Sequence, residues 1–180
     1  LNLFRSLVSD DLLLASVMLV NNEIGAIQPI AEAVEIAHGV GAFFHSDAAQ
    51  AAGKLEIDTT DLDIDYLRLS AHKMYGTMGI GALFVTAGAL VPQPLLYGGG
   101  QQQGIRPGTE PVALIAGFGA AATVARNQLK QDIAHGRTLI AAFLSELSAR
   151  QIPFHPITDP AFTVAGGVGP LRPSLDCAPL

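Results

Sequence analysis

Short apolar runs and one helical pattern alternate in the first part of the chain. Residues 12–20 are almost continuously apolar, which is typical of a central parallel strand covered on both faces. After Pro29, apolar side chains recur at helical spacing as far as Gly39, and residues 41–46 form a second short apolar run. This stretch therefore predicts a strand, a helix and a second strand in succession.

Two further strands and two helices are expected beyond this unit. Residues 66–69 and 81–85 form short apolar runs with a glycine-rich turn between them. An alanine-rich amphipathic helix is predicted over residues 111–126, and a second helix with one apolar face over residues 131–150. The tail after Pro153 is rich in proline and predicts little beyond a possible short strand.

Length and composition indicate one substantial core. The chain has 180 residues, of which 49% are hydrophobic and 14% charged, enough for one core but few for two complete domains. It opens at Leu1 without a methionine, and its last stretch has no clear closing element. We therefore expect one domain with part of another, in a fragment truncated at both ends.

Charge and cysteine content argue against several classes of function. The net charge is −6, and the ten Lys and Arg residues are scattered, so no basic stripe for nucleic acid is expected. The single cysteine, Cys177, excludes an internal disulfide and a cysteine-based metal cluster, and no apolar run has membrane-spanning length. A cytoplasmic protein without nucleic-acid or membrane partners is predicted.

Polar side chains follow three of the predicted strands. Residues 21–23 are Asn-Asn-Glu, residues 47–50 are Asp-Ala-Ala-Gln, and residues 70–73 are Ser-Ala-His-Lys. Ligands of open α/β sheets bind outside the carboxyl ends of the strands, so we expect these groups at one rim. An amine for a Schiff base and a carboxylate for a pyridine nitrogen are what pyridoxal phosphate (PLP) chemistry requires. Lys73 and Asp47 could fill these roles.

Each of these residues also has a purely structural interpretation. A lone lysine after a strand is usually solvated, and Asp47 could cap the helical turn of the following alanines. His72 could be a partly buried structural histidine, and Asn21 with Asn22 an ordinary turn. Only the combination of groups favours a cofactor site.

Four motifs occur in a fixed order, and the chain between about residues 12 and 125 contains them all. They are Val-Asn-Asn-Glu-Ile-Gly at 20–25, His-Ser-Asp-Ala-Ala-Gln at 45–50, Ser-Ala-His-Lys-Met-Tyr-Gly at 70–76, and Gly-Gly-Gly-Gln at 98–101 leading to Arg-Pro-Gly-Thr at 106–109. In order and spacing they resemble cysteine desulfurases, members of the class V aminotransferase group of fold type I PLP enzymes.

This resemblance implies an α/β fold and a division into domains. Residues 1–125 would form the C-terminal part of the PLP-binding large domain, a mostly parallel sheet with flanking helices. Residues 126–180 would form a connecting helix and an incomplete small C-terminal domain.

The resemblance also implies roles for individual residues. Lys73 would be the catalytic residue that forms the Schiff base with PLP. The other implied cofactor contacts are Asp47 at the pyridine nitrogen, Asn22 and Gln50 at the phenolate side, and Ser70 and His72 at the phosphate. Thr109 would reach the phosphate of the neighbouring subunit's cofactor, so a homodimer is implied.

The implied reaction removes sulfur from L-cysteine, releases L-alanine and leaves a persulfide on a cysteine of the enzyme. The sulfur would pass to an iron–sulfur scaffold or another acceptor protein. Cys177 does not match the family's catalytic cysteine, and Arg172 matches the substrate-binding arginine only weakly. The family's N-terminal phosphate turn and ring-stacking histidine are not found. We therefore expect this chain alone to bind PLP poorly and to have little activity.

Three alternatives remain open at this point. A selenocysteine lyase or another class V enzyme would share the turn at residues 106–110. A non-catalytic remnant could dimerise or occupy a scaffold without binding PLP. A nucleotide-binding α/β domain is weakly supported, because no Gly-x-Gly-x-x-Gly or Walker-type loop follows a predicted strand.

Overall fold

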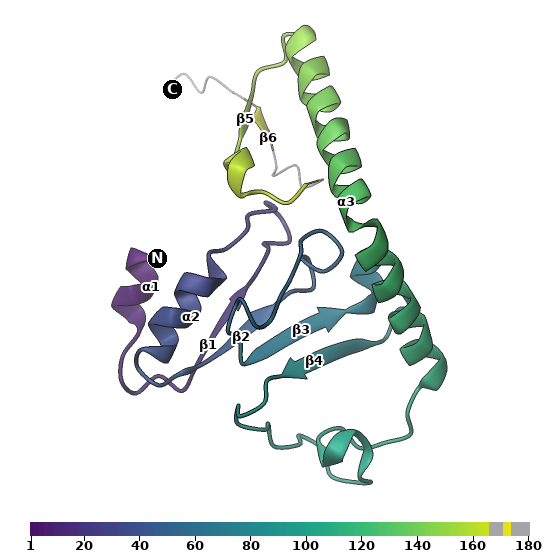
Figure 1. Ribbon diagram of the computed structural model, residues 1–180. Coiled ribbons are helices and arrows are strands. Elements are labelled where there is room, and N and C mark those ends of the chain that lie inside the picture. Colours follow the sequence, from purple (N-terminus) through teal and green to yellow (C-terminus); the bar gives the residue numbers. More distant parts are fainter. Residues whose placement is uncertain (166–170, 174–180) are drawn as a thin grey trace, which may run out of the picture.

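A four-stranded sheet forms the centre of the chain in the computed structural model, which describes residues 1–165 and 171–173 (Figure 1). The strands lie in the order β1-β2-β3-β4; β1 to β3 run parallel, and β4 runs antiparallel to β3. Their bounds are β1 Leu14–Met18, β2 Phe43–Asp47, β3 Tyr66–Ser70 and β4 Gly81–Val85. The predicted α/β class with a mostly parallel sheet and flanking helices is confirmed.

β1 lies at an edge of this sheet and not at its centre. Among the described residues it pairs only with β2, and the side chains of Leu13 and Leu14 are 68% and 46% exposed. The prediction of a central strand covered on both faces is therefore wrong for the described part of the chain. A continuous apolar run shows that a strand can be buried, but it does not say how many neighbours the strand has.

Two short helices accompany the β1 side of the sheet, α1 (Asn2–Leu7) and α2 (Ile30–His38). α2 begins directly after Pro29 and ends before Gly39, as the sequence predicts. It buries one face against β1 and β2, where Phe44 is fully enclosed. The buried residues of this face are Ile30, Ala33, Val34, Ile36 and Ala37. This core packs α2 onto the sheet.

A buried carboxylate joins α2 to the sheet. Asp65 accepts a hydrogen bond from the backbone N–H of Phe44 at 2.7 Å, and the same oxygen lies 2.9 Å from Nε2 of His38. A buried polar group is tolerated when it is hydrogen-bonded, and here both partners belong to elements that the core brings together. Asp65 therefore strengthens the packing of α2 on the sheet.

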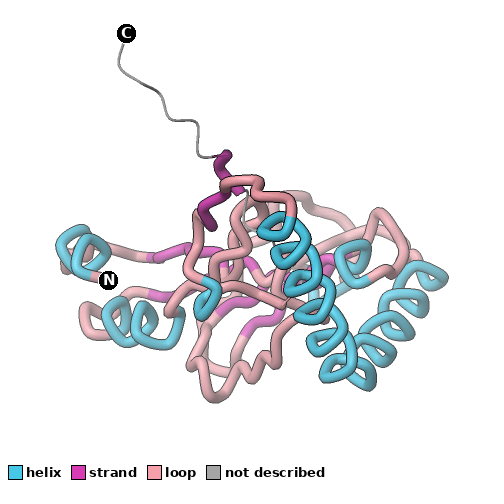
Figure 2. Tube along the Cα trace, turned by 90° about the horizontal axis from the view of Figure 1, so that it is seen from above, coloured by secondary structure: helices cyan, strands magenta, loops and turns pink. Residues whose placement is uncertain are grey.

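One long helix, α3 (Val112–Ala149), lies beside the sheet and packs against the turn that follows β3 (Figures 1 and 2). The prediction of two helices over residues 111–126 and 131–150 is therefore wrong. Residues 127–130 are Asn-Gln-Leu-Lys and contain neither proline nor glycine, so nothing interrupts the helical backbone. The predicted domain boundary after residue 125 falls inside α3, and the division into two domains stays a prediction.

Glycine allows α3 to approach the turn that follows β3. This turn begins with the short helix η1 (Ala71–Met74). A Cβ atom on Gly76 would lie 2.9 Å from the Cβ of Ala121, and one on Gly117 would lie 2.6 Å from Cγ2 of Thr77. Both contacts are closer than real side chains permit. The close packing of α3 on this turn therefore depends on the absence of a Cβ atom at Gly76 and Gly117.

The C-terminal segment returns to the sheet edge after α3. It contains β5 (Phe154–Pro156), η3 (Pro160–Phe162) and β6 (Leu171–Pro173), and β6 pairs antiparallel with β5. This confirms the possible short strand after Pro153. The backbone N–H of Ile27 donates to Phe162 O at 2.8 Å, and that of Val164 donates to Gly25 O at 3.1 Å. The C-terminal segment thus packs against the loop that follows β1.

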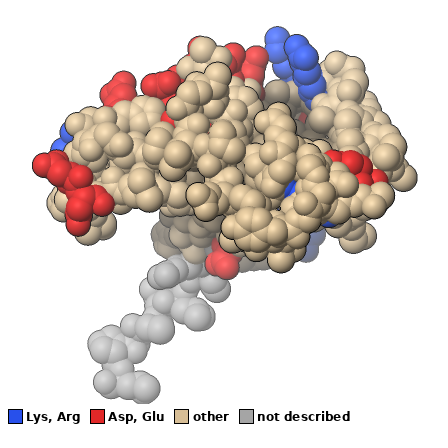
Figure 3. Space-filling model, turned by 90° about the horizontal axis from the view of Figure 1, so that it is seen from below, with Lys and Arg blue, Asp and Glu red and all other residues tan. Residues whose placement is uncertain are grey.

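An exposed apolar surface extends from β4 through the loop before η2 (Gln101–Gly104). Its exposed large side chains are Leu83, Phe84, Leu90, Val91, Leu95, Leu96 and Tyr97. On the face drawn in Figure 3, charged side chains are scattered and most of the surface is uncharged. Within the described residues, no helix is long and apolar enough to cross a membrane.

Two glycines of α3 provide a matched test of its packing. Gly119→Ala adds a methyl group to open space, so we expect it to raise the free energy of unfolding by about 0.5–1 kcal/mol through helix propensity. Gly117→Ala gains the same propensity but clashes with Thr77, and we expect a net loss of about 1–2 kcal/mol. Urea unfolding of the purified chain, followed by circular dichroism, measures both. Equal effects would contradict the proposed packing.

Candidate functional site

The carboxyl ends of β1, β2 and β3 meet at one edge of the sheet. Their parallel register pairs Met18 with Asp47 and Asp47 with Arg68, so β1 and β2 end level and β3 continues two residues further, to Ser70. The polar turns at residues 21–23, 47–50 and 70–73 all begin at this edge. The expected common rim is therefore present.

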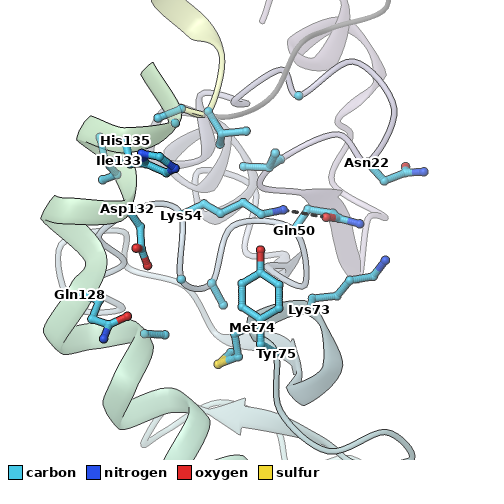
Figure 4. Close-up of a pocket in the computed structure, with 18 of the residues that line it drawn as sticks. Asn22, Gln50, Lys54, Lys73, Met74, Tyr75, Gln128, Asp132, Ile133 and His135 are labelled. Atoms are coloured by element: carbon cyan, nitrogen blue, oxygen red, sulfur yellow. Dashed lines mark hydrogen bonds between the residues drawn. The ribbon is translucent and has the colours of Figure 1, made fainter. Parts of the chain in front are cut away.

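A cavity of about 710 Å³ lies between this rim and α3 (Figure 4). Three of the predicted site residues line it, namely Asn22, Gln50 and Lys73. α3 forms the opposite wall with a mixture of small, apolar and polar side chains: Ala121, Val124, Ala125, Gln128, Asp132, Ile133, His135 and Gly136. The cavity therefore has an amine and two amides on the sheet side and space beside them.

Lys73 lies in η1, immediately after β3. The backbone N–H of Ala71 donates to Ile80 O at 3.2 Å, and η1 ends at Tyr75, whose φ of 61° is left-handed. This tight turn places Lys73 at the cavity with its side chain exposed. An accessible primary amine at this position can react with a carbonyl group.

Asparagine and glutamine side chains reach the cavity from two different turns. Asn21 uses its own Oδ1 to accept the backbone N–H groups of Glu23 and Ile24 at 2.9 and 3.0 Å, which is the ordinary turn considered for it. Asn22 is exposed and lines the cavity. Gln50 is half-buried there. Of the two neighbouring asparagines, Asn22 is thus the one available to a ligand.

Lys54 is a second amine in the same cavity, which the sequence analysis missed. Its Nζ donates a hydrogen bond to Oε1 of Gln50 at 3.1 Å (Figure 4). Burial lowers the pKa of Lys54 below its usual value, and the nearby charge of Lys73 lowers that pKa further. The spacing of four residues from Gln50 was the available signal, because such a pair can meet on one side of a helical turn.

Asp47 ends β2 beside the cavity rather than in its lining. Its Oδ1 accepts the backbone N–H of Ala49 at 2.9 Å, which is the capping role considered for it, and its Oδ2 is ion-paired with Arg68. Arg68 is another residue that the sequence analysis did not single out. Strand register brings it opposite Asp47, which a single sequence does not reveal.

His45 lies on the same face of β2 as Asp47. Its Nδ1 is 2.8 Å from the hydroxyl of Ser16 on β1. Burial lowers the pKa of His45; the charge of Asp47 opposes this shift, and that of Arg68 adds to it. The polar groups of three strands thus form one connected patch beside the cavity.

The two residues expected at a phosphate lie in a separate depression. Ser70 and His72 line a cavity of about 470 Å³ together with Arg68. Ser70 is buried and His72 exposed. Of the predicted residues at the strand ends, Asn22, Gln50 and Lys73 thus line one cavity and Ser70 and His72 the other, whereas Asp47 lines neither.

Thr109 lies apart from both of these cavities. It is exposed in the segment before α3, after Gly108, whose φ is 109°. The backbone N–H of Gly108 donates to Oε1 of Gln101 at 3.0 Å, which stabilises the turn. Cys177 lies outside the described residues, and the structure describes only the backbone of Arg172, in β6.

The donor set at the rim fits PLP in kind. Lys73 offers an amine for a Schiff base, Asp47 a carboxylate, and Asn22 and Gln50 amide donors. Within the described residues, no group of three or more histidine, cysteine or acidic side chains could hold a metal ion. The chemistry of the rim therefore suits an organic cofactor with a reactive carbonyl.

Comparison with known sequences gives consistent results. Residues 1–159 match the family described as aminotransferase class-V. Over 151 residues the chain is 44% identical to the cysteine desulfurase IscS of Rickettsia bellii, and this match covers 83% of the chain and 37% of that relative. IscS of Rickettsia akari is 43% identical with the same coverage. The chain thus spans little more than a third of these relatives.

Solved structures share the fold as well. A NifS-like protein superposes with a TM-score of 0.85 at 32% identity, covering 91% of this chain and 45% of its own. DndA from Streptomyces lividans gives 0.79 at 35% identity, with 88% and 45% covered. SspA in complex with cysteine gives 0.62 at 41% identity, with 68% and 35% covered. Since the family match covers most of the chain and the fold agrees, this chain belongs to the class V aminotransferase family, a family of PLP-dependent enzymes that includes the cysteine desulfurases.

Proposed function

We propose that the protein containing this chain is a PLP-dependent cysteine desulfurase. It would convert L-cysteine to L-alanine and carry the sulfur as a persulfide to an iron–sulfur scaffold or another acceptor protein. The main support is the position of Lys73, Gln50 and Asn22 around one cavity at the carboxyl edge of a parallel sheet. The identity of 44% to IscS and the similarity to SspA, described in complex with cysteine, favour this substrate.

Each residue of the rim would have a separate role in the reaction. When bound, PLP supplies an electron-withdrawing ring that stabilises negative charge at the α-carbon of an amino acid. Lys73 would hold the cofactor covalently and, once the substrate amine replaces it, would transfer protons. Asp47 would hold a proton at the ring nitrogen, and Arg68 keeps this carboxylate in place.

The turns after β1, β2 and β3 would also supply hydrogen-bond donors for the anionic groups of the cofactor. Gln50 and Asn22 would donate from their amide NH₂ groups to the ring oxygen. The hydroxyl of Ser70 and the ring N–H of His72 would donate to the phosphate, in the depression that Arg68 also lines. A positively charged guanidinium there favours an anion electrostatically.

A homodimer with shared sites is part of the proposal. Thr109 is exposed and belongs to neither cavity, so it is free to contact a second subunit. The exposed apolar surface between β4 and η2 would be covered in such a dimer, since contiguous apolar patches commonly mark interfaces. We also propose a cytoplasmic location, because a reducing compartment keeps the thiols of the reaction free.

Chemical trapping would test the assignment of Lys73. Reduction of the PLP-loaded complete gene product with borohydride, followed by peptide mass spectrometry, should find the cofactor on Lys73. Lys54 is the matched internal control, because it is an amine in the same cavity. We expect Lys73→Ala to lower the desulfurase rate at least about 1000-fold, since no other residue replaces a covalent catalyst. An adduct mainly on Lys54 would overturn the assignment.

The separated chain should bind PLP poorly. It spans 37% of the IscS relatives, so much of the polypeptide that those relatives have is not part of these 180 residues. We expect no stable visible absorbance from bound PLP when the purified 180-residue chain is mixed with equimolar cofactor. A stable band that Lys73→Ala abolishes would refute this expectation.

Complementation between two inactive variants would test the shared site. In a mixed dimer of Lys73→Ala and Thr109→Ala subunits, one of the two sites would contain both wild-type residues. Random pairing should therefore restore about a quarter of the wild-type rate. Desulfurase activity after co-expression of the two variants measures this. No recovery, although mixed dimers form, would contradict the role of Thr109 across the interface.

A further inference from the structure

The turn after β2 brings an amide and an amine together. The backbone N–H of Ala52 donates to Ala48 O at 2.9 Å, and that of Lys54 donates to Ala51 O at 2.9 Å. These hydrogen bonds close a tight turn between Ala48 and Lys54, which brings the side chains of Gln50 and Lys54 within hydrogen-bonding distance. Gln50 and Lys54 both line the cavity.

Neighbouring elements hold this turn in place. Gly53 has a φ of 76°, which glycine adopts without strain. A Cβ atom on Gly53 would lie 3.4 Å from the Cβ atoms of both Met74 in η1 and Ala125 in α3. The turn thus lies against η1 on one side and α3 on the other. Lys54 is therefore not a freely moving surface residue, and its side chain is half-buried.

The hydrogen bond between the two side chains has a fixed direction. Nζ of Lys54 donates to Oε1 of Gln50 at 3.1 Å. An ammonium group has donors only, whereas an amide has one accepting oxygen and one donating nitrogen. Lys54 therefore selects the amide orientation in which the oxygen faces Lys54. In Figure 4 the amide nitrogen of Gln50 points away from Lys54.

We infer that Lys54 is a positioning residue that acts through Gln50, holding its amide so that the NH₂ group donates to an anionic oxygen of the bound cofactor. This inference rests on the proposed function, because it takes PLP as the occupant of the cavity. In the opposite orientation the amide oxygen would face the anion and repel it. An amide can rotate between the two, and only a partner that cannot accept hydrogen bonds excludes one of them.

The electrostatics of the cavity agree with this role. Lys54 and Lys73 line the same cavity, and the charge of Lys73 disfavours the charged form of Lys54. An anionic oxygen of the cofactor beside Gln50 would compensate the charge of Lys54. Burial of Lys54 makes its hydrogen bond stronger than the same contact in water, because the local dielectric constant is lower.

Substitution of Lys54 in the complete gene product would test the inference. Lys54→Met keeps the apolar stem and removes the donor, whereas Lys54→Arg keeps a donor-only group. Lys130→Met, on the exposed surface of α3, is the matched control. The readouts are the Kd of PLP, measured by equilibrium dialysis, and the pH midpoint of the visible absorbance change of bound PLP. Circular dichroism checks the fold of each variant.

Loss of one oriented donor should weaken cofactor binding moderately. We expect Lys54→Met to raise the Kd of PLP roughly fivefold, and Lys54→Arg and Lys130→Met to remain within about twofold of wild type. The pH midpoint should rise by about half to one unit in Lys54→Met, because loss of the oriented NH₂ donor of Gln50 favours the protonated form of the bound cofactor. A midpoint and Kd equal to those of wild type would overturn the inference.

A double-mutant cycle separates positioning from a general effect of charge. If Lys54 acts through Gln50, Lys54→Met should change nothing further in a Gln50→Leu background. An equal additional loss there would show that Lys54 acts by its own charge and would overturn the inference. Gln50→Glu is an independent second variant, because it keeps the contact with Lys54 but has no NH₂ group. It should lose as much affinity as Gln50→Leu.

The proposed function can fail separately from this inference. Wild-type protein without a borohydride-trapped adduct on Lys73 would overturn the proposed function, and this inference would be overturned with it. An adduct on Lys73 in wild-type protein, with unchanged Lys54→Met, overturns only the role of Lys54.

Discussion

Parallel hydrogen bonding between β1, β2 and β3 is the constraint on which the site depends. Parallel strands place all their carboxyl ends at one edge, so turns that are far apart in sequence become neighbours. Asn22, Gln50 and Lys73 reach one cavity for this reason. An antiparallel pairing of the same strands would send their turns to opposite edges and separate the amine from the amides.

The second wall of the cavity depends on three glycines, whose lack of a side chain permits close packing. Gly53, Gly76 and Gly117 lie where α3, η1 and the turn after β2 approach one another. A methyl group at Gly76 or Gly117 would force atoms closer than 3.0 Å, and one at Gly53 would meet both neighbours at 3.4 Å. Close packing here brings α3 over the strand ends, where its small residues leave space for a ligand. The geometry of the cavity is thus a property of the contact between sheet and helix.

Polar contacts at the rim show how one residue can have a structural and a chemical role together. Asp47 caps its own turn through Ala49 and is ion-paired with Arg68, and it is also the carboxylate that we propose for the ring nitrogen of the cofactor. Gln50 is similar, because its oxygen is engaged by Lys54 while its nitrogen remains available. Structural and functional interpretations of these residues are therefore compatible.

Local pattern was sufficient for the elements of the sheet and for the choice of candidate residues. Apolar runs predicted all four strands of the sheet to within a few residues, and Pro29 and Gly39 marked the ends of α2, because these signals arise from interactions between near neighbours. The motifs around Asn22, Asp47 and Lys73 likewise indicated the family, since residue types and their spacing can be read from the sequence without knowledge of the fold.

Only the tertiary structure decided how these parts are arranged. The edge position of β1, the pairing of Arg68 with Asp47 and the continuity of α3 each depend on contacts between distant segments or on the absence of any local break. Lys54 belongs to the same group, because its importance comes from Gln50, Lys73 and α3 around one cavity. The sequence alone determined which groups are present, and packing determined which of them meet.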